Sequence, residues 1–363
     1  MRLVFLCGCL DPGKDGVGDY VRRLAGELVR QGHQVAAIAV NERELGCPIK
    51  REIQVDEFSD LSSSVSVLRL SSQVNWRERS EEIVEFLKTE RPDVISVQFV
   101  PYSFHRKGIP FSFVGNLIGI ARQFDARWNV MFHELWLAGD SAPTKKKKIV
   151  GWLQRRLVSR LLSRLDSMCK LVVTTNSELH KEQLLKIGVE TVNRLPLFSN
   201  IAFVEHSDDS RVPGVATDEF VVLHFGSFGS NVEAYLLGLE RTTKLAAEKR
   251  LKLFVVGGGG PHREKCLNAM KAALIDGQVV DFGRVDASLV SSLMASSDVM
   301  ISRAKKSTWQ KSGSVMAALE HGVDVICSDG TVIGRDNAVS CQRVADEFVE
   351  LMGAECGTVS NVR

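Results

Sequence analysis

The sequence predicts an α/β protein made of two doubly wound parallel-sheet domains. Short apolar or β-branched runs alternate with segments of helical period along the whole chain. This alternation is typical of parallel strands joined by crossover helices. The chain has 363 residues, of which 44% are hydrophobic. A chain of this length and composition favours two cores of roughly 150–200 residues each over a single large one.

The first half of the chain predicts one complete series of strands and helices. A continuous apolar run indicates a buried strand, and apolar residues recurring every three or four positions indicate a helix. The expected elements, in order, are a strand at 3–9, a helix at 17–31, a strand at 34–40, a helix at 81–89, a strand at 93–98, a helix at 111–124, a strand at 129–133, a helix at 146–165, a strand at 170–175, a helix at 177–187 and a strand before Leu195.

A second series follows a polar stretch. Residues 204–218 include Pro213 and Gly214, and we place the linker between the domains there. The predicted domains are therefore 1–203 and 219–363. The second series comprises a strand at 220–225, a helix from 231, a strand at 251–256, a helix after Pro261, a strand at 278–282, a helix at 287–295, a strand at 298–302, a short helix from 312 and a strand at 323–327.

Charge, cysteine usage and hydropathy exclude several classes of function. A net charge of +2 gives no overall field of the kind that nucleic-acid binding requires, so no nucleic-acid partner is expected. The eight cysteines show no paired metal-ligand spacing, and we interpret them as reduced thiols of a cytoplasmic protein without a metal site. No cleavable signal and no apolar run of about 20 residues is expected, so no segment is predicted to span a membrane.

The segment from 298 to 327 predicts a phosphate site. A strand leads through a turn with Arg303 and Lys311 to a helix that opens at Ser312, Gly313 and Ser314. Free backbone N–H groups, the positive end of the helix dipole and a fixed cation then converge on one anion. Later in this helix, Glu320 is interpreted either as a ligand of ribose hydroxyls or as an ordinary surface glutamate.

Two glycine-containing loops follow the first strand of each half. Gly16 and Gly18 would let the backbone approach a phosphate or sugar, although a flexible strand-to-helix turn explains them equally well. Ser227 lies in the corresponding loop of the second half, where backbone donors can reach a diphosphate. The glycine run at 257–260 favours a structural turn.

Polar residues at the ends of two central strands predict a second wall of the site. His133 and Glu134 follow the strand at 129–133, where a histidine can donate a hydrogen bond or hold a positive charge beside a phosphate. The neighbouring carboxylate of Glu134 can orient a hydroxyl. Gln98 ends another strand at the same edge of the sheet and either contacts an acceptor or packs within its loop.

A basic amphipathic helix is expected over residues 145–165. Apolar residues recur near every fourth position, and lysines and arginines occupy the other face. Such a helix either packs on the first domain with a solvated outer face or docks on an anionic membrane surface.

Together these segments resemble the GT-B glycosyltransferases, specifically the large retaining nucleotide-sugar family that includes mannosyl- and glucosyltransferases of bacterial polysaccharide biosynthesis. The resemblance rests on Gly16-Val17-Gly18 before a helix, on Gly32 and His33, on His133, and on the segments 315–322 and 325–330. It implies two Rossmann-like domains, acceptor-side (1–203) and donor-side (219–363). It also implies metal-independent transfer of a hexose from a nucleotide-diphosphate sugar, with His133 and Lys311 as catalytic residues.

One departure from this family leaves alternatives open. The two glutamates that the family usually places eight positions apart align with Trp309 and Ala317. The resemblance therefore also allows a donor-impaired or non-catalytic module that binds a glycan or partner, or a sugar-nucleotide epimerase. For a transferase, the implied acceptor is a saccharide or a lipid-linked saccharide, reached in the cytoplasm or at the inner face of the membrane.

Overall fold

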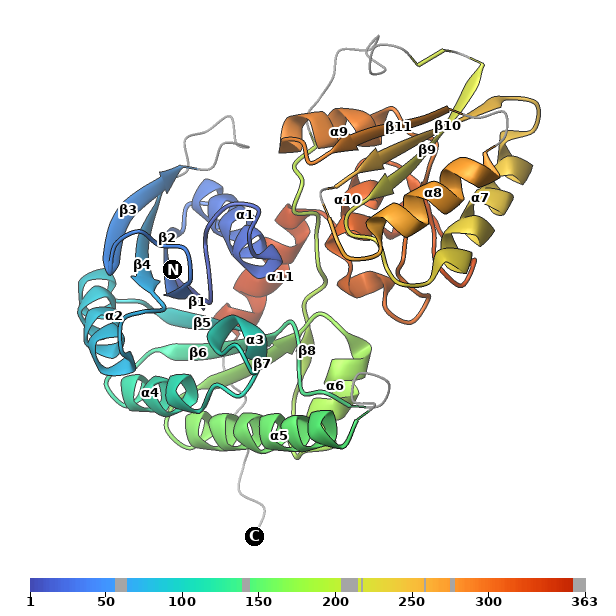
Figure 1. Cartoon of the computed structure of the whole chain (residues 1–363). Helices are drawn as coiled ribbons and strands as arrows, with labels where there is room; N and C mark the ends of the chain where they lie inside the picture. The colour runs from blue at the N-terminus through green and yellow to red at the C-terminus, as the bar shows by residue number, and fades with distance from the viewer. Residues whose placement is uncertain are drawn as a thin grey trace. The chain divides into compact units, whose positions relative to one another are not determined.

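The computed structural model describes residues 1–55, 64–138, 144–203, 215–216, 218–257, 259–274 and 278–354. The chain divides into two compact units (Figure 1). Unit 1 contains residues 1–196 and 341–363, and unit 2 contains residues 197–340. The predicted linker at 204–218 falls largely outside the described residues.

The described strands of unit 1 form one eight-stranded sheet in the order β3-β4-β2-β1-β5-β6-β7-β8. All neighbours pair in parallel except β3, which is antiparallel to β4. The winding reverses between β1 and β5, which is the doubly wound arrangement that the sequence predicts. The strands are β1 Arg2–Cys7, β2 Gln34–Glu42, β3 Ile49–Val55, β4 Ser64–Ser71, β5 Val94–Phe99, β6 Arg127–Phe132, β7 Leu171–Thr175 and β8 Asn193–Arg194.

Helices cover both faces of this sheet because side chains of a strand alternate between its faces. Val4 and Leu6 of β1 belong to the core that includes side chains of α2, α4 and α5. Phe5 points to the opposite face and packs against Phe348 of α11, with ring centroids 5.6 Å apart. The helices of unit 1 are α1 Gly16–Arg30, α2 Trp76–Glu90, α3 Pro101–Phe104, α4 Phe111–Ala121, α5 Lys145–Asp166, α6 Glu178–Leu185 and α11 Cys341–Gly353.

Side-chain caps fix where four helices of unit 1 begin. The side chains of Asp15, Asn75, Thr144 and Ser177 each accept a hydrogen bond from a backbone N–H in the first turn of α1, α2, α5 and α6, respectively. Each cap satisfies one of the N–H groups that a helix start leaves without an intrahelical partner.

The last helix corrects the predicted domain boundaries. The sequence assigned all of 219–363 to the second domain, but α11 belongs to unit 1. Its buried side chains Val344, Ala345, Phe348 and Met352 form an apolar stripe, and the Gln31 side chain of α1 donates to Asp346 at 2.8 Å. Burial of this apolar stripe against the first sheet is favourable, so α11 packs on unit 1 although it follows unit 2 directly in the chain.

Unit 2 holds a six-stranded sheet in the order β11-β10-β9-β12-β13-β14, with only the edge strand β14 antiparallel to its neighbour among the described pairs. Its core cluster with Val221 and Leu223 contains α9 and α10, and the cluster with Val222 contains α7 and α8, so helices again cover both faces. The elements are β9 Glu219–Phe225, α7 Val232–Ala246, β10 Arg250–Val256, α8 Arg263–Ala273, β11 Gln278–Gly283, α9 Ala287–Ala295, β12 Val299–Ile301, η2 Trp309–Lys311, α10 Gly313–Glu320, β13 Asp324–Ile326, β14 Val332–Ile333 and η3 Arg335–Asn337.

The predicted fold class is confirmed, with differences at the edges. Each central strand lies within a few residues of its predicted position. The sequence analysis missed β3 and β4 at one edge of the first sheet, and α2 begins at Trp76, five positions before the expected start. No helix within the described residues is long and apolar enough to cross a membrane.

Candidate functional site

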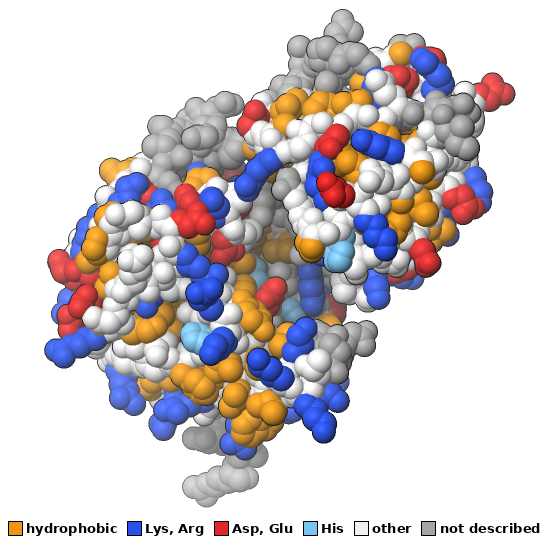
Figure 2. Space-filling model, in the orientation of Figure 1, with side chains coloured by type: hydrophobic (Ala, Val, Ile, Leu, Met, Phe, Trp, Pro, Cys, Tyr) orange, Lys and Arg blue, Asp and Glu red, His pale blue; other side chains and the backbone are white. Residues whose placement is uncertain are grey.

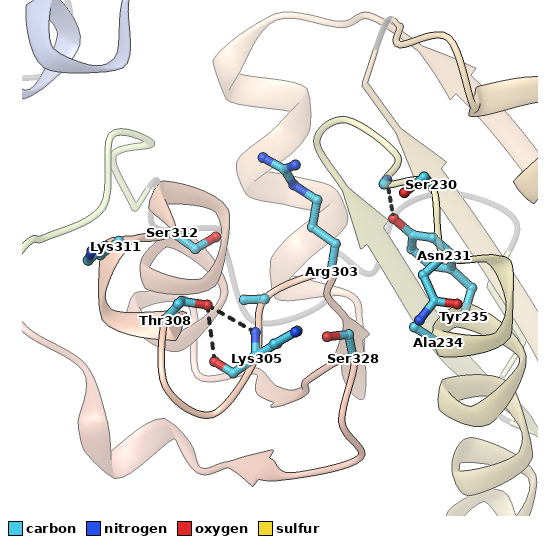
Figure 3. A pocket seen from close by; sticks show the side chains of 12 residues that line it. Ser230, Asn231, Ala234, Tyr235, Arg303, Lys305, Thr308, Lys311, Ser312 and Ser328 are labelled. Atoms are coloured by element: carbon cyan, nitrogen blue, oxygen red, sulfur yellow. Dashed lines mark hydrogen bonds between the residues drawn. The ribbon is translucent and has the colours of Figure 1, made fainter. Parts of the chain in front are cut away.

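Unit 2 contains a cavity of about 410 Å³ at the carboxyl ends of β9, β12 and β13 (Figure 3). The winding of the second sheet reverses between β9 and β12, and ligands of doubly wound sheets bind at this switch point. The lining residues come from the loop after β9, the start of α7, the loop after β12, the start of α10 and the loop after β13: Gly229, Ser230, Asn231, Ala234, Tyr235, Arg303, Ala304, Lys305, Thr308, Lys311, Ser312 and Ser328.

The charge of this cavity has one sign. Arg303, Lys305 and Lys311 line it, and none of its described lining residues is acidic. Figure 3 shows Arg303 projecting from the end of β12 between Ser230 and Ser312, with Lys311 at the edge of the group. Such a cavity favours a ligand with at least one negative charge.

Two helices begin at the cavity wall. Asn231 is the N-cap of α7, and its side chain makes no capping hydrogen bond. Ser312 is the N-cap of α10, and its Oγ accepts from the Val315 N–H at 3.4 Å and lies 3.0 Å from the Ser314 Oγ. Both helix starts therefore direct partial positive charge and N–H groups toward the region that Arg303 occupies.

Buried aromatic residues support the loop after β9. The Tyr235 hydroxyl accepts a hydrogen bond from the Gly229 N–H at 2.6 Å. The ring of His224 stacks on Phe228 with centroids 4.1 Å apart. Burial lowers the pKa of His224 to about 4, so this imidazole is neutral at physiological pH. The loop after β9 is thus held by buried aromatic side chains beneath it.

A carboxylate outside the lining fixes the loop after β12. Asp329 accepts from the Lys306 N–H at 2.8 Å and from the Thr331 N–H at 3.1 Å. The bond from the Lys306 backbone is the main reason why the pKa of Asp329 is lowered. The segment that carries Arg303 and Lys305 is thereby tied to the turn after β13.

The predicted donor-side residues separate into two groups. Arg303, Lys311 and Ser312 line the cavity. Gly313 is the first residue of α10, and Ser314 follows it with its hydroxyl near Gly226; neither is a lining residue. Ser227 is exposed in the loop after β9, next to the lining residues but not among them.

The structure places Glu320 at the opposite end of α10 from the cavity, and its interpretation as a ribose ligand stays a prediction. Glu320 is the last residue of α10, whereas Ser312 at the cavity caps its start. With a rise of about 1.5 Å per residue, the two ends of this helix lie roughly 10 Å apart. Glu320 is not among the described residues that line the cavity.

Unit 1 contains a second cavity, of about 380 Å³, at the carboxyl ends of β1, β2 and β5. This is the switch point of the first sheet, but the lining is rich in carboxylates. The lining residues are Cys9, Asp11, Lys14, Asp15, Asn41, Glu42, Arg43, Glu44, Val100, Tyr102, Ser103 and Glu134.

A buried ion network forms the floor of this second cavity. Glu42, only 2% exposed, accepts from the Leu10 N–H at 2.8 Å and from the Arg69 Nε at 3.0 Å. Burial alone would lower the pKa of Arg69, but its hydrogen bonds to Glu42 and Glu52 outweigh burial and raise it. Carboxylates and hydroxyls held in this way can accept hydrogen bonds from a polyhydroxylated ligand.

His133 and Gln98 are joined directly, since the His133 Nε2 lies 2.8 Å from the Gln98 Oε1. The Gln98 Nε2 donates to Ser96, and the Ser96 hydroxyl donates to Asn129, which forms a polar ladder across β5 and β6. Burial lowers the pKa of His133 to about 3, with a smaller contribution from His180. His133 is therefore neutral at physiological pH, which favours hydrogen bonding over a positive charge among its two predicted roles.

The remaining predicted residues of unit 1 surround the start of α1. Gly16 is the exposed first residue of this helix. Gly18 is buried, and a Cβ added to it would clash with the Cys9 carbonyl oxygen, so packing alone requires glycine there. Glu134 lines the unit 1 cavity.

Several cavity residues were missed by the sequence analysis. Thr308 of unit 2, and Glu42 and Glu44 of unit 1, stand in loops or strand ends without a motif around them. Their position after a predicted central strand is the signal that could have identified them. Among the described side chains, no group of three His, Cys, Asp or Glu residues is arranged to hold a metal ion.

Known structures share this fold. The Anabaena protein HepE in complex with UDP and glucose matches with a TM-score of 0.55 at 15% identity, over 96% of this chain and 89% of HepE. A glycosyltransferase from Rickettsia africae matches with a TM-score of 0.53 at 14% identity, over 96% and 87% of the two chains. A putative UDP-N-acetylglucosamine 2-epimerase from Listeria monocytogenes matches with a TM-score of 0.54 at 12% identity, over 96% and 87%.

The TM-scores show a common GT-B fold. At such low identity, the activity must be argued from the residues of the site. No curated protein matches the sequence. The model of the glycosyl transferase 4-like domain matches residues 15–197, from the N-cap of α1 to one residue beyond the first segment of unit 1. Because this match spans half of the sequence, the chain belongs to the glycosyl transferase 4-like family.

Proposed function

We propose that this protein transfers a hexose from a nucleotide-diphosphate sugar to a saccharide or lipid-linked saccharide, without a metal ion and with retention of the anomeric configuration. The unit 2 cavity is the observation that carries the proposal. Three cations and two helix starts face a space with no acidic residue in its described lining. HepE was solved with UDP and glucose and with UDP-glucose, which supports a nucleotide donor here.

The chemistry requires stabilisation of negative charge on the leaving diphosphate. Arg303 and Lys305 supply fixed positive charge, and the starts of α7 and α10 add backbone N–H donors. Preorganised groups of this kind lower the barrier because they meet the charge as it develops on the leaving oxygen. Lys311 and Ser312 line the same cavity and are available to a second phosphate.

The unit 1 cavity is assigned to the acceptor in this proposal. Its carboxylates, the Asn41 amide and the Ser103 hydroxyl suit the hydroxyl groups of a saccharide. Neutral His133 can position a hydroxyl through a hydrogen bond but cannot balance a phosphate charge. With the diphosphate itself as the base in a retaining transfer, no carboxylate is needed as a base.

A non-catalytic module is the second candidate, because of Trp309 and Ala317. Ala317 is completely buried, and Trp309 packs against the same core of unit 2. The two positions where the family usually carries carboxylates are thus used for packing. A transferase on this chain must bind its donor sugar and ribose through other groups.

Calorimetric titration with UDP, GDP and ADP, followed by incubation with the matching nucleotide sugars, tests the proposal. We expect one nucleotide to bind and its sugar to be transferred to a saccharide acceptor or slowly to water. Absence of binding by all three would favour the non-catalytic module. Conversion of a nucleotide sugar to its epimer without an acceptor would favour the epimerase.

A further inference from the structure

The orientation of α5 on unit 1 is fixed by its buried side. Leu157, Leu161 and Leu165 are at most 3% exposed in the core. Gln154 accepts from the Leu137 N–H and donates to the Gly108 carbonyl, both at 2.9 Å. A Cβ at Gly151 would clash with the Leu137 carbonyl, so the helix lies directly on that loop. Rotation of α5 would break both contacts, and its other side must therefore face outward.

That outward side carries large apolar groups that the packing of the helix does not explain. Ile149 is 60% exposed and Trp152 is 53% exposed. The Arg156 guanidinium lies 4.5 Å from the Trp152 ring centroid. Figure 2 shows hydrophobic side chains beside Lys and Arg along the lower edge of the view, where Figure 1 places α4 and α5. We call residues 145–149, Trp152, Arg155 and Arg156 the outer face of α5.

The charge of this face is as unusual as its exposed apolar groups. Four lysines at 145–148 and arginines at 155, 156, 160 and 164 give eight cations between residues 145 and 165, with no acidic residue in that stretch. None of the eight forms an ion pair with a described carboxylate.

Stability of the helix does not account for the lysines. The first turn of a helix carries partial positive charge, which favours acidic residues and opposes cations. Lysines at this end weaken α5, so their presence points to a negatively charged partner outside the helix. The partner must also accept Ile149 and Trp152.

We propose that the outer face of α5 docks on the surface of an anionic lipid bilayer. Lysines and arginines are attracted to acidic headgroups, while tryptophan and isoleucine enter the boundary between headgroups and acyl chains. Nucleic acid would match the charge but leaves exposed Ile149 without a role. No residue of the outer face of α5 is among the described residues that line either cavity, so the proposal is independent of the proposed transfer reaction. Which face of a membrane the protein meets is not addressed by this proposal, and the location at the inner face stays a prediction from the sequence.

Cosedimentation of the full chain with vesicles tests this inference. We expect binding to phosphatidylcholine vesicles that contain phosphatidylglycerol, weak binding to phosphatidylcholine alone, and release as salt is raised. Each lysine removed from 145–148 should weaken binding about fivefold at low ionic strength. The double variant Lys148→Gln/Trp152→Ala should lose more than the single charge accounts for, because Trp152 supplies apolar contact.

A matched control is available on α7 of unit 2, since Leu245 is 57% exposed and Lys249 lies just beyond the helix. The variant Leu245→Ala/Lys249→Gln removes the same kinds of group and should bind vesicles like the wild type. Circular dichroism and nucleotide titration of each variant separate loss of folding from loss of docking. Equal vesicle binding by Lys148→Gln/Trp152→Ala and the wild type would overturn the proposal. The proposal would also fail if the wild type binds an RNA oligonucleotide but stays in the supernatant when anionic vesicles are sedimented.

Discussion

Replacement of Arg303 by alanine is the most direct test of the proposed phosphate site in unit 2. Arg303 lines the cavity after β12, and no described carboxylate pairs with its guanidinium within 4.0 Å. The side chain is exposed, so its removal should change the free energy of unfolding by no more than about 0.5 kcal/mol. The substitution thereby separates ligand binding from stability.

The expected loss in affinity follows from one charged hydrogen bond. Such a bond contributes about 1.5–3 kcal/mol net, or about 10- to 150-fold in the dissociation constant. Because Arg303 is exposed to solvent, which weakens the interaction, we expect a value near the lower end, about tenfold. Arg303→Lys should fall between the two, since lysine keeps the charge but loses the bidentate geometry.

The assay is calorimetric titration of each variant with UDP, GDP and ADP at low and high ionic strength. Arg250→Ala is the matched control, because Arg250 is an exposed arginine of the same unit whose partner is Asp218, 3.2 Å away and outside the cavity. The control should bind within twofold of wild type. A folded Arg303→Ala protein that also binds within twofold would refute the phosphate assignment.

Three further predictions concern unit 1 and are measured by urea unfolding. Gly18→Ala should destabilise the protein by about 1–3 kcal/mol because the new Cβ would clash with a backbone carbonyl. The control Gly115→Ala on α4 places its Cβ where no neighbouring atom lies within 4 Å, and it should stabilise the protein by up to about 1 kcal/mol. Arg69→Ala should lower the free energy of unfolding by about 3–5 kcal/mol because it leaves buried Glu42 without its ion-pair partner. The control Arg77→Ala breaks only an exposed i,i+4 pair and should lower it by about 0.5 kcal/mol or less. Burial lowers the pKa of His133 to about 3 from 6.5, so the unfolded chain binds a proton that the folded chain excludes. As the pH is lowered from 6.5 to 4, the free energy of unfolding should fall by up to about 1.4 kcal/mol per pH unit. His133→Asn should reduce that slope.

The central strands could be predicted from sequence because each is an uninterrupted apolar run covered on both faces. Residues 3–7 and 94–99 are buried along their length, so their continuous apolar pattern predicts a buried strand. The edge strand β3 reads Ile-Lys-Arg-Glu-Ile-Gln-Val, where polar residues dominate and pairing with β4 supplies the order. Its assignment depends on a neighbour that the local pattern does not contain.

The membership of α11 in unit 1 could not be predicted for a related reason. Residues 341–353 follow unit 2 in the chain, and their apolar stripe fits any complementary surface. Only the shape of the first sheet and of α1 selects the partner, through contacts such as Phe348 with Phe5. Contacts between residues so far apart along the chain leave no trace in a single sequence.

The two cavities show how far topology and residues each determine a ligand. Both lie where the strand order of a doubly wound sheet reverses, so the fold accounts for their positions. The loops then give them different charges. Arg303, Lys305 and Lys311 stand in the described lining of one without a carboxylate, while Asp11, Asp15, Glu42, Glu44 and Glu134 stand in the other with only Lys14 and Arg43 as cations. The charges of the first cavity favour an anionic diphosphate and those of the second oppose it. Under the proposed function, an acceptor in the unit 1 cavity should therefore present neutral hydroxyls there and keep any phosphate outside.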